Sequence, residues 1–237
     1  MSATVKKVSP KCSTRLPLDL ITDKQQQFID RLYENDRTLA VLGAGFGKTI
    51  TTLVAMGELL SARVVSRILV IAPSRPARDV WPCEYANWAI DGYKLVYAGG
   101  SGASSRAAGF ASDAQVVVIN FENVEWAINE GLLAGFDGLV IDELSKLKAV
   151  GGSLYKRLRK LVPQFTWRVG LTATPVSEGL RWLYGQVMLL DDGAALGRNQ
   201  ERFLTKWFYP TDFNRRNWSP MPTALGEITQ AISGLLY

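Results

Sequence analysis

A glycine-rich turn between an apolar run and a helical pattern constrains the fold of this chain more than any other feature. The turn reads Gly43-Ala44-Gly45-Phe46-Gly47-Lys48-Thr49, after the apolar residues 38–42 and before the helical residues 50–60. Glycines let backbone N–H groups approach an anion closely, and a helix N-terminus adds partial positive charge. The pattern is typical of phosphate-binding loops, in which Lys48 contacts the β- and γ-phosphates of a nucleotide and Thr49 ligates Mg²⁺.

The turn departs from the common pattern at one position. The first glycine of G-x-x-x-x-G-K-[ST] falls at Leu42. A glycine turn that binds no nucleotide is therefore the alternative explanation. The Gly-x-Gly-Lys-Thr core between a strand and a helix favours the phosphate-binding loop.

Length and composition are those of one folded domain. The chain has 237 residues, of which 47% are hydrophobic and 21% charged, which suits a single α/β core and not a disordered chain. We expect a loose arm over residues 1–19 and one domain over residues 20–237. The apolar runs are too short to span a bilayer, and residues 1–20 lack the apolar segment of a signal peptide. These features predict a cytoplasmic protein with no membrane partner.

The sequence contains no histidine, and its only cysteines are Cys12 and Cys83. No disulfide framework, cysteine-rich metal site or histidine-based catalysis is therefore expected. Any general base must be a carboxylate or a lysine. The formal net charge of +5 suits a polyanionic partner, although a mildly basic protein without such a partner is the alternative.

Apolar runs that are typical of buried strands alternate with helical patterns along the chain. This alternation predicts a mostly parallel sheet flanked by helices. Ligands of such sheets bind at the carboxyl ends of the strands. The residues expected at those ends are the glycine turn, Ser74, Asn120, Asp142-Glu143 and Thr172–Thr174.

The Asp-Glu pair predicts the second half of an ATP site. Asp142 would hold Mg²⁺, usually through water, and Glu143 would orient and deprotonate the attacking water. Glu143 and Lys48 are thus the expected catalytic residues. The alternative is that the two acids only cap a helix over residues 144–148.

Two further polar stretches each have two explanations. Gln25 has capping-box spacing from Thr22 at the start of an expected helix, where it would either cap that helix or read an adenine edge. The hydroxyls of Thr172-Ala173-Thr174-Pro175 would either form an ordinary turn or hydrogen-bond the Asp142-Glu143 loop and report nucleotide state. Spacing alone does not decide between these explanations.

Basic and aromatic residues gather in two stretches. In residues 153–161 the cations lie opposite a leucine stripe, which indicates a solvated helix face or, alternatively, contact with a DNA backbone. Residues 203–218 interleave aromatic side chains with cations, a pattern of core packing, of packing against a missing lobe, or of base stacking.

Taken together, the ordered motifs resemble those of superfamily-two helicases and translocases, and within these the Swi/Snf-type enzymes of bacteriophages. The resemblance covers about residues 18–237 and implies a RecA-like P-loop NTPase lobe with ATP and Mg²⁺ as cofactors. It is carried by Gln25, Gly45–Thr49, Ala72–Ser74, Asp142–Ser145 and Leu171–Pro175, supported by Trp81–Glu84 with Trp88, Ile119–Asn123, Leu189–Gly193 and Leu196–Arg198.

The resemblance assigns the nucleotide to Gly43–Thr49 and makes Gln25 the residue that reads the adenine. Asp23 stands where the family commonly has a proline. This departure leaves the choice between Gln25 and Gln26 open.

The resemblance also implies contacts with nucleic acid, of which duplex DNA is the form expected from the subgroup. Ser74, Arg75 and Asn120 fall where such enzymes touch the nucleic-acid backbone. Thr172 and Thr174 would couple the state of ATP to that contact.

Enzymes of this type need a second RecA-like lobe, which supplies arginines to the γ-phosphate. The sequence after Thr174 is too short for such a lobe, so the resemblance implies the first lobe alone, completed by another chain or by a segment outside this sequence. We expect the isolated chain to bind Mg–ATP weakly and to hydrolyse it slowly or not at all.

Two other functions remain open. One is a non-hydrolysing DNA- or protein-binding module whose nucleotide site is vestigial or serves as a switch. The other is the motor lobe of a restriction system, which ranks lower because the sequence shows no nuclease signature.

Overall fold

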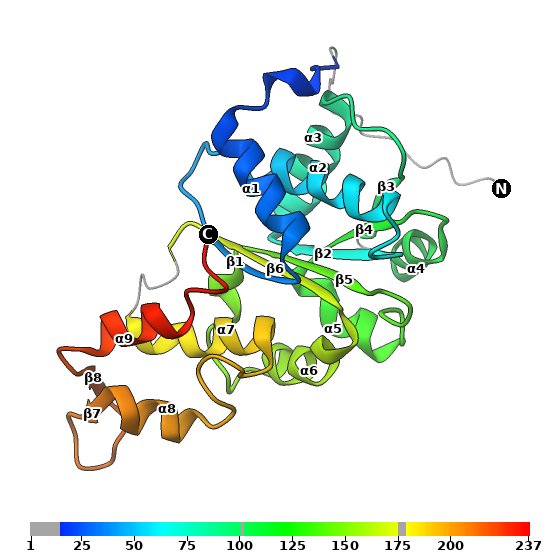
Figure 1. Ribbon diagram of the computed structural model, residues 1–237. Helices are drawn as coiled ribbons and strands as arrows, with labels where there is room; N and C mark the ends of the chain where they lie inside the picture. Colours follow the sequence, from blue (N-terminus) through cyan, green and yellow to red (C-terminus); the bar gives the residue numbers. More distant parts are fainter. Residues whose placement is uncertain (1–14, 101, 175–178) are drawn as a thin grey trace.

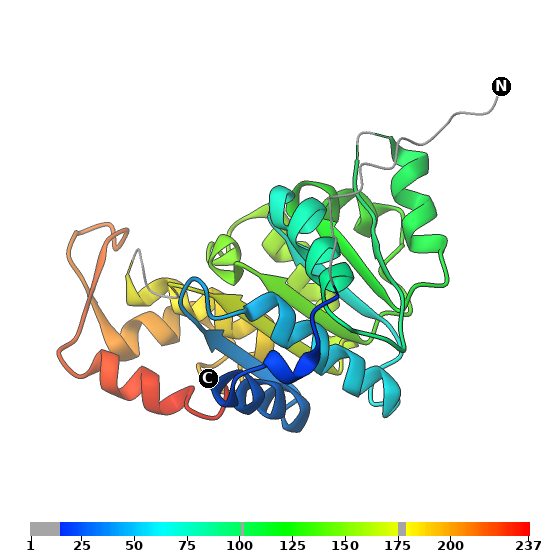
Figure 2. The ribbon, with the colours of Figure 1, turned by 90° about the horizontal axis from the view of Figure 1, so that it is seen from above.

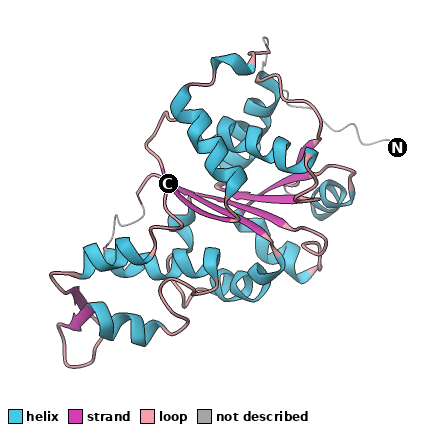
Figure 3. Ribbon diagram, in the orientation of Figure 1, coloured by secondary structure: helices cyan, strands magenta, loops and turns pink. Residues whose placement is uncertain are grey.

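In the computed structural model, which describes residues 15–100, 102–174 and 179–237, a six-stranded parallel sheet lies between two layers of helices (Figures 1 and 3). The strand order is β1-β6-β5-β2-β4-β3, which confirms the mostly parallel α/β fold. The strands are β1 (Arg37–Val41), β2 (Ile68–Ala72), β3 (Leu95–Tyr97), β4 (Val116–Asn120), β5 (Gly138–Asp142) and β6 (Trp167–Thr172).

The helices cover both faces of the sheet, as the alternating pattern predicts (Figure 1). Central strands β2 and β4 are buried along their whole length, because a parallel sheet has helices against each face. On one face lie α1 (Asp23–Glu34), α2 (Lys48–Ser61) and α3 (Trp81–Asn87), and on the other lie α5 (Phe121–Asn129), α6 (Ser153–Leu161) and α7 (Leu183–Asp191).

The starts of α1 and α3 follow from local rules. The Thr22 hydroxyl accepts a hydrogen bond from the Gln25 backbone N–H, and the Gln25 side chain accepts one from the Thr22 backbone N–H. The predicted capping box therefore starts α1. Residues 76–87 form a wide turn, Pro76–Val80, followed by α3, which has Pro82 in its first turn, where a backbone N–H has no partner within the helix to lose. The next helix, α4 (Ala103–Ala111), begins within a glycine- and serine-rich stretch.

The described part of the predicted arm, residues 15–19, is not loose. Arg15 pairs with Asp91 at 2.8 Å, and the Leu16 backbone bonds to the carbonyl of Asn87 and the N–H of Ala89. These contacts tie residues 15–19 to the end of α3. The rest of the predicted arm, residues 1–14, lies outside the described residues.

After β6 the chain adds α7, α8 (Gln200–Trp207), a separate hairpin of β7 (Phe208–Pro210) and β8 (Trp218–Pro220), and α9 (Ala224–Ala231) (Figure 3). It then returns to the main sheet. The Leu39 N–H bonds to the Leu235 carbonyl at 2.7 Å, and the Tyr237 N–H bonds to the Leu39 carbonyl at 3.1 Å. The Tyr237 ring also packs 4.8 Å from that of Phe28. The C-terminal residues therefore cover the edge of β1.

Candidate functional site

The strand order brings two groups of predicted site residues together at the carboxyl ends of the strands. On one side, β1, β6 and β5 are neighbours, so that Val41 lies opposite Thr172, and Leu171 lies opposite Asp142. On the other side, β2 and β4 pair Ala72 with Asn120. The first group holds the candidate nucleotide residues and the second holds the candidate nucleic-acid residues.

The glycine turn has the backbone shape that its sequence predicts. Gly45 and Gly47 have φ values of 80° and 88°, in the left-handed region that side chains with a Cβ disfavour. A Cβ on Gly47 would also lie only 2.5 Å from Gln25 Nε2. Gly47 caps α2, so the helix N-terminus opens directly onto the turn. Residues Gly43–Gly45 are exposed and accessible to a ligand.

The Lys48 side chain lies over the turn. Its ammonium donates to the carbonyls of Leu42 and Gly43 at 2.9 and 3.0 Å. Beside it is a hollow of about 290 Å³, lined by Gly45, Gly47, Lys48, Thr49, Ile50, Val80 and Glu84. The sequence analysis assigned no site role to Val80 or Glu84, because only the packing of α3 and the turn before it beside α2 brings them there.

Gln25 has two contacts, one expected and one new. Its Oε1 accepts from the Thr22 N–H at 2.9 Å, which confirms the capping role, and its Nε2 donates to the Phe46 carbonyl at 2.8 Å. The amide therefore links α1 to the glycine turn. Gln26 instead donates to Asp30 on its own helix at 2.8 Å. Of the two glutamines, Gln25 is the one that touches the turn, and its recognition of adenine stays a prediction.

The Asp142 carboxylate is held by a residue to which the sequence assigned no role. Trp81 Nε1 donates to Asp142 Oδ2 at 3.0 Å from the first position of α3. Burial raises the pKa of Asp142 above its ordinary value, and the Glu143 charge adds to this, whereas the Trp81 hydrogen bond and the Lys48 charge lower it.

Glu143 contacts the threonine loop. It has a left-handed φ of 62°, which is unusual for a residue with a side chain, and its Oε1 accepts from the Ser145 hydroxyl and from Thr172 Oγ1, the latter at 3.3 Å. Thr172 Oγ1 also accepts the Thr174 N–H at 3.2 Å. This is the contact that one of the two explanations for the threonine loop predicts.

The alternative role for the acidic pair, capping of a helix over residues 144–148, has no support in the geometry. The segment after Glu143 is a single turn, Leu144–Leu147, and the Glu143 side chain makes no capping hydrogen bond to it. Pro175, the last residue of the predicted threonine motif, lies outside the described residues.

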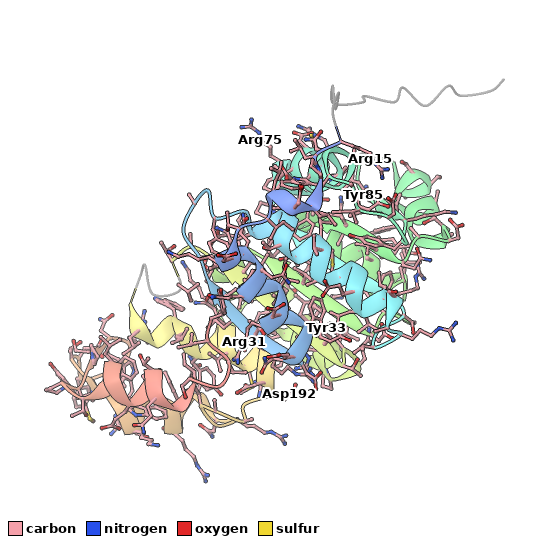
Figure 4. The ribbon with its side chains drawn as sticks, turned by 45° about the horizontal axis from the view of Figure 1, so that its top comes forward. Arg15, Arg31, Tyr33, Arg75, Tyr85 and Asp192 are labelled. Atoms are coloured by element: carbon pink, nitrogen blue, oxygen red, sulfur yellow. The ribbon has the colours of Figure 1, made fainter. Side chains whose placement is uncertain are left out.

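The candidate nucleic-acid residues form a cluster around Glu122. Glu122 Oε2 accepts from the Ser74 hydroxyl at 2.7 Å and from Asn120 Nδ2 at 2.6 Å. Asn123 Nδ2 in turn donates to Asn120 Oδ1 at 2.6 Å. The Ser74 hydrogen bond is the largest effect that lowers the pKa of Glu122. Arg75 is not part of the cluster, and its exposed side chain points away from the body of the molecule (Figure 4).

The basic stretch over residues 153–161 and the aromatic stretch over residues 203–218 differ in which of their side chains are buried. On α6, Tyr155 and Leu158 are buried and the cations face solvent, in keeping with a solvated helix face. The aromatic stretch is divided, because Phe203, Trp207 and Phe208 pack into the core whereas Tyr209 and Phe213 are exposed.

Comparisons with known proteins identify the family and the fold of this chain. Residues 19–177 match the family described as "Type III restriction enzyme, res subunit". "Putative protein p41" of Acyrthosiphon pisum secondary endosymbiont phage 1 is 31% identical over 229 residues, which cover 88% of this chain and 49% of that protein. The chain thus spans about half the length of this relative.

Two solved structures share the fold. The first is the Sulfolobus solfataricus SWI2/SNF2 ATPase core in complex with dsDNA, with a TM-score of 0.72 and 18% identity over 92% of this chain and 44% of that one. The second is the core domain from the same organism, with a TM-score of 0.68, 18% identity and coverage of 91% and 42%. In the described ranges, the helices are too short or too polar to cross a membrane. The chain belongs to the family described as the res subunit of type III restriction enzymes, whose domain is that of superfamily-two helicases, and has the fold of their amino-terminal RecA-like lobe.

Proposed function

We propose that the chain is the ATP-binding lobe of a Swi/Snf-type DNA translocase of phage type, which couples Mg–ATP hydrolysis to DNA movement when a second lobe completes it. The observation that carries the proposal is the strand order, which pairs β6 with both β1 and β5 and so brings the glycine turn after Val41 and the acidic residue Asp142 to one edge of the sheet. A glycine turn that binds no nucleotide, or an acidic pair that binds no metal, would have no need to lie beside the other motif.

The donor set suits a magnesium–nucleotide complex. Among the described residues there is no cluster of three or more His, Cys, Asp or Glu side chains for a protein-only metal site. Mg²⁺ is typically held by one or two protein groups together with phosphates and water, and Thr49 and Asp142 would be those groups here. When bound, the ion would neutralise charge on the phosphate oxygens.

Residues of the chain itself would bind the phosphates and activate the attacking water. Lys48 would exchange its bonds to the turn carbonyls for bonds to phosphate oxygens. Glu143 would orient a water molecule and accept its proton, a task that falls to a carboxylate in a chain without histidine. Its contact with Thr172 would make the threonine loop sensitive to that step.

Duplex DNA is the proposed partner, with Ser74, Arg75 and Asn120 facing its backbone. The net charge of +5 supports a polyanionic ligand. A structural relative was solved with dsDNA, which favours the duplex form. We place the protein in the cytoplasm of a bacterial host, since its relative is a phage protein.

The test is steady-state ATP hydrolysis with and without duplex DNA, for the chain alone and with any protein that co-purifies with it. We expect weak Mg–ATP binding and little turnover alone, and DNA-stimulated turnover with the second lobe. Glu143→Gln should keep ATP binding and abolish turnover. Robust DNA-stimulated hydrolysis by the chain alone would contradict the need for a second lobe.

A second candidate function is a binding module with a vestigial or switch-like nucleotide site. It is favoured by the polar atoms of Lys48 and Gln25, which hydrogen-bond the turn's own carbonyls. Such a module would be indifferent to Glu143→Gln in every assay. A loss of turnover or of biological effect in that variant excludes it.

A further inference from the structure

The hairpin formed by β7, β8 and the turn between them, residues 208–220, is a separate element that we call the tip hairpin. It projects on the side of the molecule toward which β1 and β6 point (Figures 1 and 2). Its base is anchored by Phe208, which is 2% exposed and stacks on Phe203. Its far end carries Phe213, which is 101% exposed.

The turn of the tip hairpin is ordered by one acidic side chain. The Asp212 carboxylate accepts the backbone N–H groups of Arg216 and Asn217 at 2.7 and 3.1 Å, and Asn217 Nδ2 at 2.9 Å. Trp218 Nε1 donates to the Arg215 carbonyl at 2.8 Å. The exposed side chains of the turn are therefore presented on a fixed backbone, which lowers the entropy cost of binding.

The surface around this turn is positively charged. Arg215 and Arg216 are exposed. The Arg181 guanidinium lies beside them, where it donates to the Arg216 carbonyl at 3.5 Å and lies 4.6 Å from the ring centroid of Trp182. Among the described residues, no carboxylate lies within 4.0 Å of these three guanidinium groups. The acidic residue of the turn, Asp212, accepts hydrogen bonds from backbone N–H groups and not from these guanidinium groups.

Shallow hollows flank the same residues. One of about 300 Å³ and one of about 260 Å³ share Arg181 and Trp218 in their walls, and the second also includes Arg215 and Arg216. Guanidinium groups around a hollow offer planar pairs of donors that match phosphate oxygens.

We propose that the tip hairpin binds duplex DNA, with Arg215, Arg216 and Arg181 on backbone phosphates and Phe213 directed into the groove between them. Arginine and asparagine beside an exposed apolar wedge are the residue types by which proteins grip a DNA groove. Guanidinium groups without carboxylate partners complement a polyanion better than an apolar protein face. The inference rests on the proposed DNA function and adds a second contact, apart from Ser74 and Asn120.

The experiment measures binding of the full chain to a fluorescein-labelled random duplex by anisotropy, over a series of KCl concentrations. Each of Arg215→Gln and Arg216→Gln should lower the slope of log K against log[salt] by about 1, and the double variant by about 2, since each removes one phosphate contact. Phe213→Ala should weaken binding several-fold and leave the slope unchanged, because it removes an apolar contact.

Arg63→Gln is the matched control. Arg63 is an exposed arginine just after α2, at the end of that helix opposite the glycine turn, so this substitution should leave both affinity and slope unchanged. Circular dichroism of each variant verifies that the fold is intact.

Three results would overturn the proposal. The first is a wild-type chain that binds duplex DNA while the tip-hairpin variants keep its affinity and slope. The second is normal DNA binding by those variants with loss of association with a second-lobe protein, which would assign the tip hairpin to a protein contact. If the wild-type chain binds no duplex DNA at any salt concentration, the proposed DNA function fails, and this inference fails with it.

Discussion

The indole N–H of Trp81 donates to the carboxylate of Asp142 at 3.0 Å, which joins the first residue of α3 to the last residue of β5. The Trp81 side chain is fully buried. The hydrogen bond favours the charged form of Asp142, against the burial that raises its pKa. The indole therefore orients the carboxylate proposed to hold magnesium and helps to keep it ionised.

Trp81→Phe should raise the magnesium concentration needed for half-maximal ATP binding by roughly tenfold to a hundredfold, the usual effect of losing a group that orients a metal ligand. It should also lower the free energy of unfolding by about 1.5–3 kcal/mol, because a half-buried carboxylate loses a donor. Magnesium titrations of nucleotide binding and urea unfolding measure the two effects.

Trp167→Phe is the matched control for this prediction. Trp167 is equally buried and donates its indole N–H to the Leu32 carbonyl at 2.9 Å, remote from the acidic pair. The Trp167→Phe variant should be less stable than wild type, and its magnesium concentration for half-maximal ATP binding should be unchanged. An equal magnesium effect in both variants would show that loss of stability alone is responsible.

Asp142→Asn should stabilise the magnesium-free chain at neutral pH. The pKa of Asp142 is raised above its ordinary value of 3.8, so its protonated form is favoured in the folded state. The stabilisation of the folded chain by protonated Asp142 is complete below the pKa that this carboxyl has in the unfolded chain. It is lost as the pH rises through the higher pKa of the folded chain. The stability gap between variant and wild type should therefore grow from about pH 4 upward. Thermal unfolding from pH 3 to 8 tests it, and a less stable variant at pH 7 would contradict it.

Thr172→Val should impair turnover more than binding. It removes the hydroxyl that donates to Glu143 and keeps the side-chain shape. We expect DNA-stimulated ATP hydrolysis of the lobe with its partner to fall on the order of 10–100-fold, because the Glu143 carboxylate loses one of the two hydroxyl donors that orient it. ATP affinity should stay unchanged.

Thr38→Val provides the comparison for the threonine prediction. Thr38 is a fully buried threonine on the neighbouring strand β1, and its hydroxyl has no hydrogen-bond partner among the described residues. Its replacement should leave hydrolysis intact. Identical rates for Thr172→Val and wild type would contradict a link between the threonine loop and the acidic pair.

Glu122→Gln should tighten duplex binding. The Ser74 hydroxyl has one proton and donates it to Glu122, so a phosphate must compete with this carboxylate for it. The glutamine keeps an acceptor oxygen and removes the repulsive charge. We expect affinity to rise roughly two- to fivefold at low salt, the size of an exposed charge pair. Glu130→Gln, at the far end of α5, makes the same charge change without this cluster and should have a smaller effect. An equal gain in duplex affinity in both variants would show that Glu122 does not compete with DNA for the Ser74 hydroxyl.

Arg168 should be the most sensitive charged position for stability. Its side chain is 1% exposed and donates to the carbonyls of Phe165, Leu189 and Leu190, and to Asp192 at 2.8 Å. Arg168→Met leaves the buried carbonyls without donors and should cost about 3–5 kcal/mol. Asp192→Asn should cost less, because that carboxylate is 35% exposed. Chemical denaturation of both variants measures the difference, and equal losses would contradict this account.

Local rules in the sequence determined the parts of the site. Glycine was needed where φ is 80° and 88°, at Gly45 and Gly47, and the capping box of Thr22 and Gln25 marked the start of α1. The apolar runs located the strands, and the polar residues that follow them were expected at the carboxyl edge of the sheet. These features act over a few residues, which is why the sequence alone was enough to predict them.

Only the tertiary structure decided which of those parts meet. Each of the six strands contains an apolar run, and no local pattern in these runs states that β6 lies between β1 and β5. This order nevertheless sets Thr172 beside Val41 and brings Asp142 into the same site. The contact of Trp81 with Asp142 spans 61 positions and depends on the packing of α3 against the sheet. The division of the aromatic stretch into a buried base and an exposed tip depends likewise on packing. Strand order and helix packing minimise exposed apolar surface over the whole chain, a global condition that no single segment encodes.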